Sequence, residues 1–166
     1  MQLRDLLTDI PVSQDAVVPL AIKQLMRESL NIADDWQRAE TLLLKAQAEL
    51  PEELELQVAL YKLYAYSNRF EESLSFINSV LETAAKIVGF ENDWRTLKAD
   101  SADWQPATGA TRLYLYSLKA AGFVNLRKGN IDLALEVLTK LQELDPLDQV
   151  GGSVVYEMAM RIVEDE

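Results

Sequence analysis

The residues best suited to acid–base chemistry or metal binding in this chain are carboxylates. Asp93, Asp100 and Asp103 lie in one irregular stretch, DWRTLKADSADWQPATGATRLY, and oxygen ligands of this kind suit a hard cation such as calcium. The stretch lacks the glycine and the closing glutamate of a helix-loop-helix calcium site, so we interpret these acids as solvated loop residues. The adjacent pairs Glu52–Glu53 and Glu71–Glu72 project about 100° apart on a helix, which does not make an acid–base dyad.

Two residue types are absent altogether. The chain has no cysteine, which excludes disulfides, thiolate metal sites and thiol nucleophiles. It has no histidine, which removes the commonest general base and the commonest transition-metal ligand. A glycine-rich phosphate-binding loop is also missing from the sequence. We therefore predict that the protein is not an enzyme and that it has no cofactor and no bound metal.

The charge balance of the chain bears on its partners. The net charge is −11, and the 16 basic residues are scattered, with Arg127–Lys128 as the longest basic run. Because clustered Lys and Arg drive binding to phosphate groups, we expect neither nucleic acid nor an anionic membrane as a partner.

The length and the first residues bear on the class of protein. The 166 residues suit one domain with a single core, and no apolar run reaches the roughly 18 residues of a membrane span. The opening MQLRDLLTDIP mixes charge into every turn and lacks the apolar core of a secretory signal. We expect a cytoplasmic protein.

Hydrophobic periodicity predicts helices along most of the chain. Apolar residues recur at helical spacing in three runs, each preceded by another apolar-rich helical segment across a short polar turn. The faces of these runs are Trp36, Ala39, Leu42, Leu43, Ala46 and Leu50, then Phe70, Leu74, Ile77 and Leu81, then Ile131, Ala134, Leu135, Leu138 and Leu141. No alternating β-branched pattern competes, so we predict an all-α fold built from antiparallel helix hairpins.

The three hairpins share a common register. A shift of 34 residues places Trp36 on Phe70 and Leu43 on Ile77, and a shift of 61 residues places Phe70 on Ile131. This agreement indicates an internal repeat rather than unrelated helices.

A 34-residue helix–turn–helix period resembles the tetratricopeptide repeat (TPR) family. The third hairpin carries the most complete match, with Leu118, Ala121, Gly122, Gly129, Ala134, Leu138 and Pro146. The resemblance implies one solenoid domain over residues 1–166, with repeats at about 20–53, 54–87 and 115–148 and an insertion at 88–114. Where the family has a small residue for close helix approach, the first two hairpins have Arg27 and Tyr61.

Helices at both ends are expected to cap the solenoid, because no hairpin buries its apolar face alone. An amphipathic segment at Met1–Ile10 and a helix at about 150–163 suit these roles. The residues expected to face inward are Leu3, Leu6, Leu7 and Ile10 in the first and Tyr156, Met160 and Val163 in the second.

In the TPR family, the first helix of each repeat lines a concave groove that receives a peptide or a partner helix. By register, the resemblance places residues of these helices there, and our main candidates are Lys62, Tyr66, Tyr116, Lys119, Phe123 and Arg127. Aromatic and cationic side chains together suit a protein segment with apolar anchors and a carboxylate or acidic side chain. Packing within the repeats is the alternative for the aromatic residues, and simple solvation is the alternative for Lys119 and Arg127.

The insertion at 88–114 holds two of the three tryptophans, Trp94 and Trp104. Loops of this length are uncommon unless they are functional or packed down, and a buried indole removes roughly 150–250 Å² from water. We predict that the two tryptophans fold the insertion back onto the repeats, and exposed tryptophans that await a partner are the alternative. The sequence leaves open whether the insertion blocks the groove or contributes to binding.

Two functional hypotheses follow from this architecture. In the first, the protein is a scaffold, adaptor or chaperone-like accessory factor that binds a peptide or protein segment in its groove. In the second, it is a structural subunit of a larger assembly or of a homo-oligomer, such as a homodimer.

Overall fold

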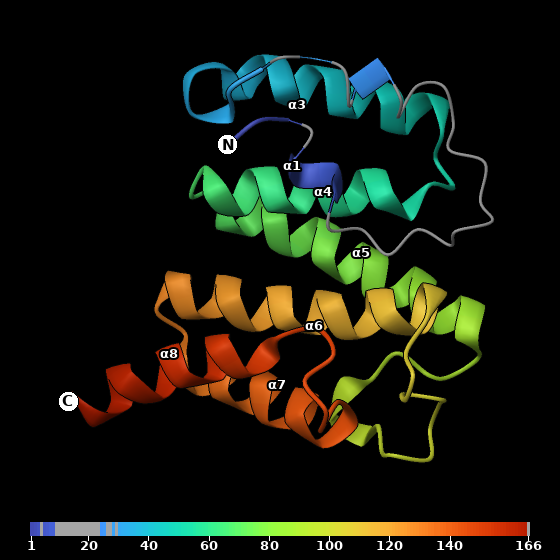
Figure 1. The fold of residues 1–166 in the computed structure, drawn as a ribbon, viewed down its shortest axis with the longest axis vertical. Coiled ribbons are helices and arrows are strands. Elements are labelled where there is room, and N and C mark those ends of the chain that lie inside the picture. Colours follow the sequence, from blue (N-terminus) through green and yellow to red (C-terminus); the bar gives the residue numbers. More distant parts are fainter. Residues whose placement is uncertain (4, 9–23, 26–27, 29, 166) are drawn as a thin grey trace. The chain divides into compact units, whose positions relative to one another are not determined.

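The computed structural model describes residues 1–3, 5–8, 24–25, 28 and 30–165. These residues form seven α-helices, one 3-10 turn and no β-strand, so the predicted all-α class is confirmed. The elements are α1 (Asp5–Thr8), α3 (Ile32–Glu49), α4 (Leu54–Tyr66), α5 (Phe70–Val88), η1 (Trp94–Thr96), α6 (Gly109–Lys128), α7 (Ile131–Leu144) and α8 (Gly152–Glu164) (Figure 1). Within this described part, every helix is too short or too polar to cross a membrane.

The chain divides into two compact units, Met1–Phe76 and Ile77–Glu166. Unit 1 contains α1, α3, α4 and the first turns of α5. Unit 2 contains the remainder of α5, η1, α6, α7 and α8. The boundary therefore falls inside one continuous helix, between Phe76 and Ile77.

In unit 1, α3 begins at an asparagine cap. The side-chain oxygen of Asn31 accepts a hydrogen bond from the Ala33 N–H at 2.9 Å, and Asp34 and Asp35 place negative charge at the positive end of the helix dipole. The buried residues of α3 are Ile32, Ala39, Leu43 and Ala46. Three of these four lie on the face that the periodicity predicts.

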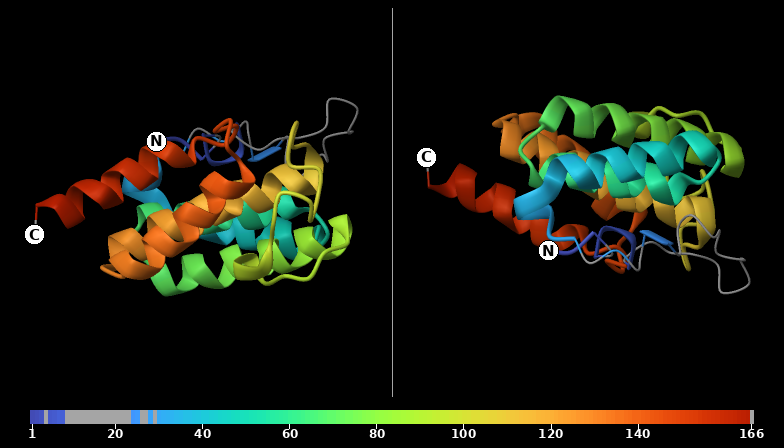
Figure 2. Two further views of the ribbon diagram at one scale, coloured as in Figure 1. Left: turned by 90° about the horizontal axis from the view of Figure 1, so that it is seen from below. Right: turned by 90° about the horizontal axis from the view of Figure 1, so that it is seen from above.

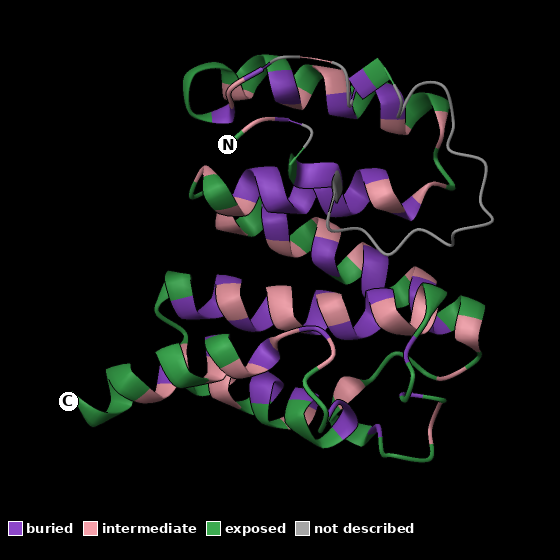
Figure 3. Ribbon diagram, in the orientation of Figure 1, coloured by how far each residue is buried: buried purple, intermediate pink, exposed green. Residues whose placement is uncertain are grey.

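The next helix, α4, is enclosed on all sides. Every residue from Leu56 to Tyr64 is buried, and Figure 3 shows α4 as purple along most of its length. Both α3 and α1 pack against α4. The predicted inward packing of the N-terminal segment is confirmed for Leu3, Leu6 and Leu7, which are buried, while Ile10 lies outside the described residues.

Arg69 joins three helices of unit 1. Its guanidinium lies 4.7 Å from the centroid of the Trp36 ring and 5.1 Å from that of the Tyr64 ring. The same group pairs with Glu40 at 2.9 Å and with Glu72 at 2.5 Å. Burial and a hydrogen bond with Glu40 raise the pKa of Tyr64 above its ordinary value. Arginine suits this position because a planar guanidinium both stacks on rings and binds carboxylates.

In unit 2, α6 and α7 form a hairpin closed by glycines. Gly129 follows α6 with φ 93°, a left-handed conformation that glycine adopts without strain. Gly122 allows α7 to approach closely, because a Cβ at this position would lie 2.6 Å from Cγ of Leu138. Of the predicted inward residues of α7, Ala134, Leu138 and Leu141 are buried, and Ile131 and Leu135 are half-buried.

The last helix, α8, packs against α7 and α6 through a different face from the one predicted. The buried residues of α8 are Gly152, Val155 and Ala159. Tyr156 and Met160, predicted to face inward, are half-buried, and Val163 is 40% exposed, so this prediction was wrong. The cause is a close approach at Gly152, where a Cβ would overlap the side chain of Leu141, and this contact sets the rotation of α8.

The repeat boundaries differ from the expected ones in places. Helices α4 and α5 together cover 54–88, close to the second predicted repeat at 54–87. The third hairpin starts earlier than expected, because α6 begins at Gly109 rather than at residue 115, so the segment between α5 and α6 covers 89–108. Most of the predicted first helix of the first repeat lies outside the described residues.

Candidate functional site

In the central part of α6, one strip is partly exposed while the other sides are buried. Among residues 113–126, four are not buried, namely Tyr116, Lys119, Ala120 and Phe123. Their spacing of three and four residues places them on one side of the helix, and Arg127, which is exposed, continues the same line. These five residues are called the α6 strip below. Four of the six predicted groove residues are thus brought together on one surface.

Cations and aromatic rings lie side by side along the α6 strip. The Lys119 ammonium is 4.7 Å from the centroid of the Tyr116 ring, and the Arg127 guanidinium is 5.9 Å from that of Phe123. Lys119 also donates a hydrogen bond to the Val150 carbonyl at 2.8 Å, which ties α6 to the segment before α8. Such pairs combine apolar ring surface with positive charge.

The two predicted groove residues on α4 are placed differently. Lys62 is only 8% exposed and lies inside the enclosed part of α4, against which the apolar residues of α1 pack. Tyr66, near the end of the helix, is 54% exposed. It borders a pocket of about 260 Å³ whose lining is Met1, Ile32, Ala33, Trp36, Tyr66 and Ser67. Of these two residues, Tyr66 alone is presented at a surface.

The segment between α5 and α6 is held down by an aromatic cluster. Trp104 is 3% exposed, and its ring centroid lies 5.5 Å from that of Phe90 and 6.2 Å from that of Tyr114. The Trp104 indole N–H donates to the Lys98 carbonyl at 2.9 Å. Burial, aided by the carboxylate of Asp93, raises the pKa of Tyr114 above its ordinary value. The prediction of a buried indole is confirmed for Trp104.

Trp94 is less buried than Trp104. It is half-buried in η1, with the Arg95 guanidinium 4.2 Å from its ring centroid. Arg95 in turn pairs with Glu136 on α7 at 2.8 Å. Trp94 therefore differs from the prediction, because a cation rather than an apolar core covers one face of its ring.

The residues that fasten this segment to the end of α7 were not predicted. The Gln149 amide oxygen accepts from the Ala107 N–H at 2.8 Å, and its amide nitrogen donates to the Trp104 carbonyl at 2.7 Å. Asp145, 4% exposed, accepts from the N–H groups of Gln149 and Val150 at 3.0 and 3.1 Å. Both side chains lie in a polar turn, and nothing in its sequence distinguishes them from solvated loop residues.

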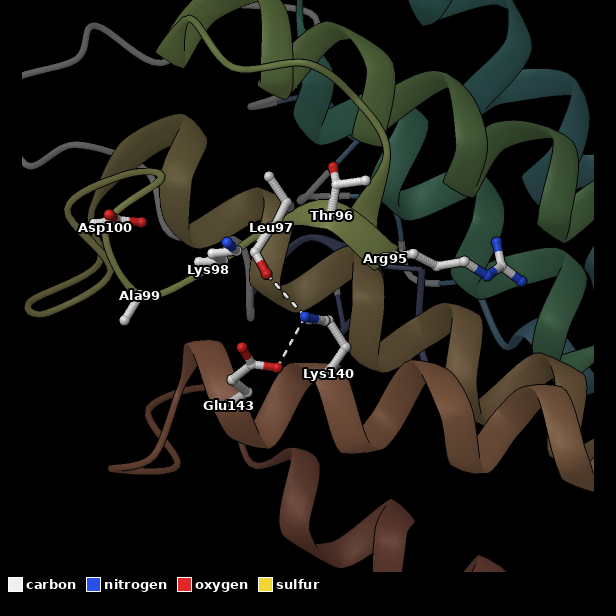
Figure 4. Close-up of a pocket in the computed structure, with 8 residues that line it drawn as sticks. All are labelled: Arg95, Thr96, Leu97, Lys98, Ala99, Asp100, Lys140 and Glu143. Carbon is white, nitrogen blue, oxygen red and sulfur yellow. Dashed lines mark hydrogen bonds and ion pairs between the residues drawn. The ribbon is translucent and has the colours of Figure 1, made fainter.

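An open pocket of about 860 Å³ lies where this segment meets α7 (Figure 4). Its lining is Arg95, Thr96, Leu97, Lys98, Ala99, Asp100, Lys140 and Glu143. The Lys140 ammonium donates to the Leu97 carbonyl at 2.8 Å and pairs with Glu143 at the same distance. Cations and acids are mixed in this pocket, and Lys140 is paired with Glu143. We therefore interpret the pocket as part of the contact that attaches the segment between α5 and α6 to α7.

The three acids considered as cation ligands lie at the surface. The Asp93 carboxylate accepts a hydrogen bond from the Arg95 N–H at 3.3 Å at the start of η1, and Asp100 and Asp103 are exposed. Among the residues that the structure describes, no group of three or more acids is placed to hold a metal ion. The α6 strip is therefore the best candidate for a functional site.

Comparison with known proteins gives one informative match. No family model and no solved structure matches the chain. Over 122 residues it is 30% identical to a protein of Azotobacter chroococcum mcd 1 described as "Uncharacterized 19.8 kDa protein in nifW 5'region". The match covers 72% of this chain and 68% of that relative. At this identity and coverage, the chain belongs to the same family as the Azotobacter protein.

Proposed function

We propose that the protein is a non-catalytic protein-interaction module that binds a peptide or protein segment along the α6 strip. In this proposal the helix hairpins stack as a TPR-like solenoid, and α6 is the helix that meets the ligand. The observation that carries the proposal is the open side of α6. The central part of α6 is buried on its other sides, so it offers one narrow surface, and that surface holds aromatic and cationic residues.

The chemistry of the strip supports a ligand with two features. The rings of Tyr116 and Phe123 offer flat apolar area at little loss of conformational freedom, which suits apolar or aromatic anchor residues. Lys119 and Arg127 add a positive charge beside each ring, and this charge suits a carboxylate from an acidic side chain or a C-terminus. We expect the guanidinium of Arg127 to make the main ionic contact, since Arg127 is exposed whereas Lys119 is half-buried.

The proposal is tested by selecting peptides from a random display library on the immobilised full chain. We expect the selected peptides to combine apolar anchors with an acidic residue or a free carboxylate. Phe123→Ser and Arg127→Glu are each expected to weaken their binding by about tenfold or more.

Lys128→Glu is the matched control. Lys128 is exposed on the same helix, but it projects about 100° away from Arg127, so its reversal should leave affinity within about twofold. Peptides that bind both strip variants as tightly as the unmodified chain would contradict the proposal, as would selection of basic peptides only.

A further inference from the structure

The outer side of α8 carries a stripe of exposed apolar residues. Val154 is 62% exposed, Met158 is 38% exposed and Ile162 is 39% exposed. Each follows the last by four residues, so the three side chains form one line about 12 Å long. The inner side of the helix, with Gly152, Val155 and Ala159, is used for packing in unit 2. These three outer residues are called the α8 stripe below.

We propose that the α8 stripe pairs with the α8 stripe of a second copy, with the two helices antiparallel about a two-fold axis near Met158 and Ala159. A contact of this symmetry uses the same surface on both copies and closes as a dimer. In this arrangement Met158 meets Met158 of the second copy, and Val154 lies level with the turn that holds Ile162 of the second copy. The apolar line is thus complementary to itself.

The charges beside the stripe are also complementary to themselves. Glu157 and Arg161 lie two residues on either side of Ala159, so an axis at this level sets Glu157 opposite Arg161 of the second copy. The symmetry then forms the same ion pair twice. In a parallel pair the edge of the stripe that carries Glu157 and Arg161 would lie on opposite sides of the contact in the two copies, so these charges would form no such ion pair.

The acidic end of α8 points to the same orientation. Glu164 and Asp165 lie at the C-terminal end of the helix, where the dipole disfavours negative charge. In the antiparallel pair they lie level with Gly152 and Ser153 of the second copy, at the positive end of that helix. The residues least favourable for an isolated α8 therefore become favourable in the pair.

The structure leaves room for this contact. Figures 1 and 2 show the C-terminal half of α8 extending beyond the ends of α6 and α7, so a second helix can lie along it. One pair of short helices buries less than the roughly 1,200 Å² of stable interfaces. We therefore expect a weak dimer that forms as concentration rises.

Sedimentation velocity of the full chain over a wide concentration range tests the proposal. We expect a reversible monomer–dimer equilibrium, and Met158→Asp should raise the dimer dissociation constant by about tenfold or more. Ile87→Asp is the matched control, because Ile87 is a 64% exposed apolar residue on α5 and should leave the constant unchanged. Circular dichroism checks that each variant keeps its helical content.

A charge-swap mixture tests the geometry itself. Glu157→Arg and Arg161→Glu should each weaken self-association, because each places two like-charged pairs across the axis. Mixed together, the two variants should form a heterodimer at least about tenfold tighter than either homodimer, since both pairs are then of opposite charge. A chain that stays monomeric at every concentration would overturn the proposal. A dimer that survives Met158→Asp, or a mixture no tighter than its components, would overturn it too.

Discussion

Single residues set how closely the helices of unit 2 approach one another. Gly122 stands where a Cβ would meet the side chain of Leu138, and Gly152 stands where one would meet Leu141. Both leucines are buried, so neither can move aside without disturbing its neighbours. The second contact also sets the rotation of α8, which is why the apolar α8 stripe faces outward.

Gly122→Ala is expected to lower the free energy of unfolding by about 1–2 kcal/mol. Alanine favours a helix over glycine by about 1 kcal/mol, but overpacking against Leu138 costs roughly 1–3 kcal/mol, and the clash should prevail. Denaturant unfolding gives the difference. In a Leu138→Val background, which makes room, the same substitution should be neutral or stabilising, and a Gly122→Ala chain more stable than the unmodified one would contradict the expected clash.

Asp148 provides a pH-dependent prediction. Its carboxylate accepts hydrogen bonds from the Ser153 hydroxyl at 2.6 Å and from the Ser153 N–H at 3.0 Å, and these bonds lower the pKa of Asp148 below its ordinary value. A lowered folded-state pKa means that the stabilisation is present above the unfolded pKa and is lost as the pH falls through the folded-state value. The first turn of α8 should therefore lose protection under acid conditions.

Hydrogen exchange of α8, corrected for the intrinsic rate at each pH, measures this effect. Asp148→Ala should lower the protection of the first turn at neutral pH and reduce its further loss below about pH 4. Glu157→Ala, on the same helix, should keep the acid response of the unmodified chain. An acid response that is unchanged by Asp148→Ala would show that another group controls this turn.

At the scale of elements, the segment between α5 and α6 is joined to unit 2 through backbone groups. The Trp104 carbonyl and the Ala107 N–H both form hydrogen bonds with the Gln149 side chain, and the Leu97 carbonyl accepts one from the Lys140 side chain. Buried backbone groups without such partners are costly, so these side chains act as substitutes for a regular secondary structure. The segment is therefore attached firmly although η1 is its only helical element.

Gln149→Ala should release part of this segment. Two backbone groups lose their partners, and we expect the free energy of unfolding to fall by about 1–3 kcal/mol. Hydrogen exchange of peptides from 97–108 should increase, while α6 and α7 stay protected. Gln142→Ala, at an exposed glutamine on α7, serves as the control. Equal exchange in the two variants would argue that Gln149 does not hold this segment in place.

Periodicity predicted the helices and most of their inner faces because burial repeats with the helical turn. Ala39, Leu43, Leu138 and Leu141 illustrate this. Each belongs to the single apolar face of its helix, and that face packs against the core. The rotation of α8 was not predictable in this way, because small residues at Gly152 and Ala159 decide it. The burial of Lys62 was missed for a related reason. Nothing in the sequence around a lysine indicates that another segment of the chain will pack over it.

The candidate site likewise has one part that the sequence predicts and another part that it does not. The α6 strip follows from register, because its members are spaced along a helix whose other sides are apolar. The anchoring by Gln149 depends on contacts with residues 42 and 45 positions away, and single-sequence patterns do not report such contacts.

For the whole molecule, the net charge of −11 is the dominant property. Like charges repel within the compact chain, and salt screens them, with a Debye length of about 10 Å at 0.1 M. Local ion pairs such as Arg69–Glu40 work in the opposite direction, but 27 acids stand against 16 basic residues, so we expect repulsion to dominate.

The melting temperature should consequently rise when sodium chloride is increased from about 0.01 to about 0.15 M. We expect a change of about 2–4 °C, which corresponds to about 1 kcal/mol for a chain of this size. Differential scanning calorimetry measures it, and potassium chloride should give the same result if screening is the cause. A falling melting temperature would mean that the ion pairs outweigh the repulsion.

The position of α5 across the boundary of the two units limits how this protein can be divided. A cut between Phe76 and Ile77 would sever a helix and leave unsatisfied N–H and C=O groups on both sides of the break. A natural end of the helix lies at Gly89, whose φ of 103° takes the chain out of α5. Any exchange of modules between members of this family, by recombination or by engineering, must therefore carry α5 whole.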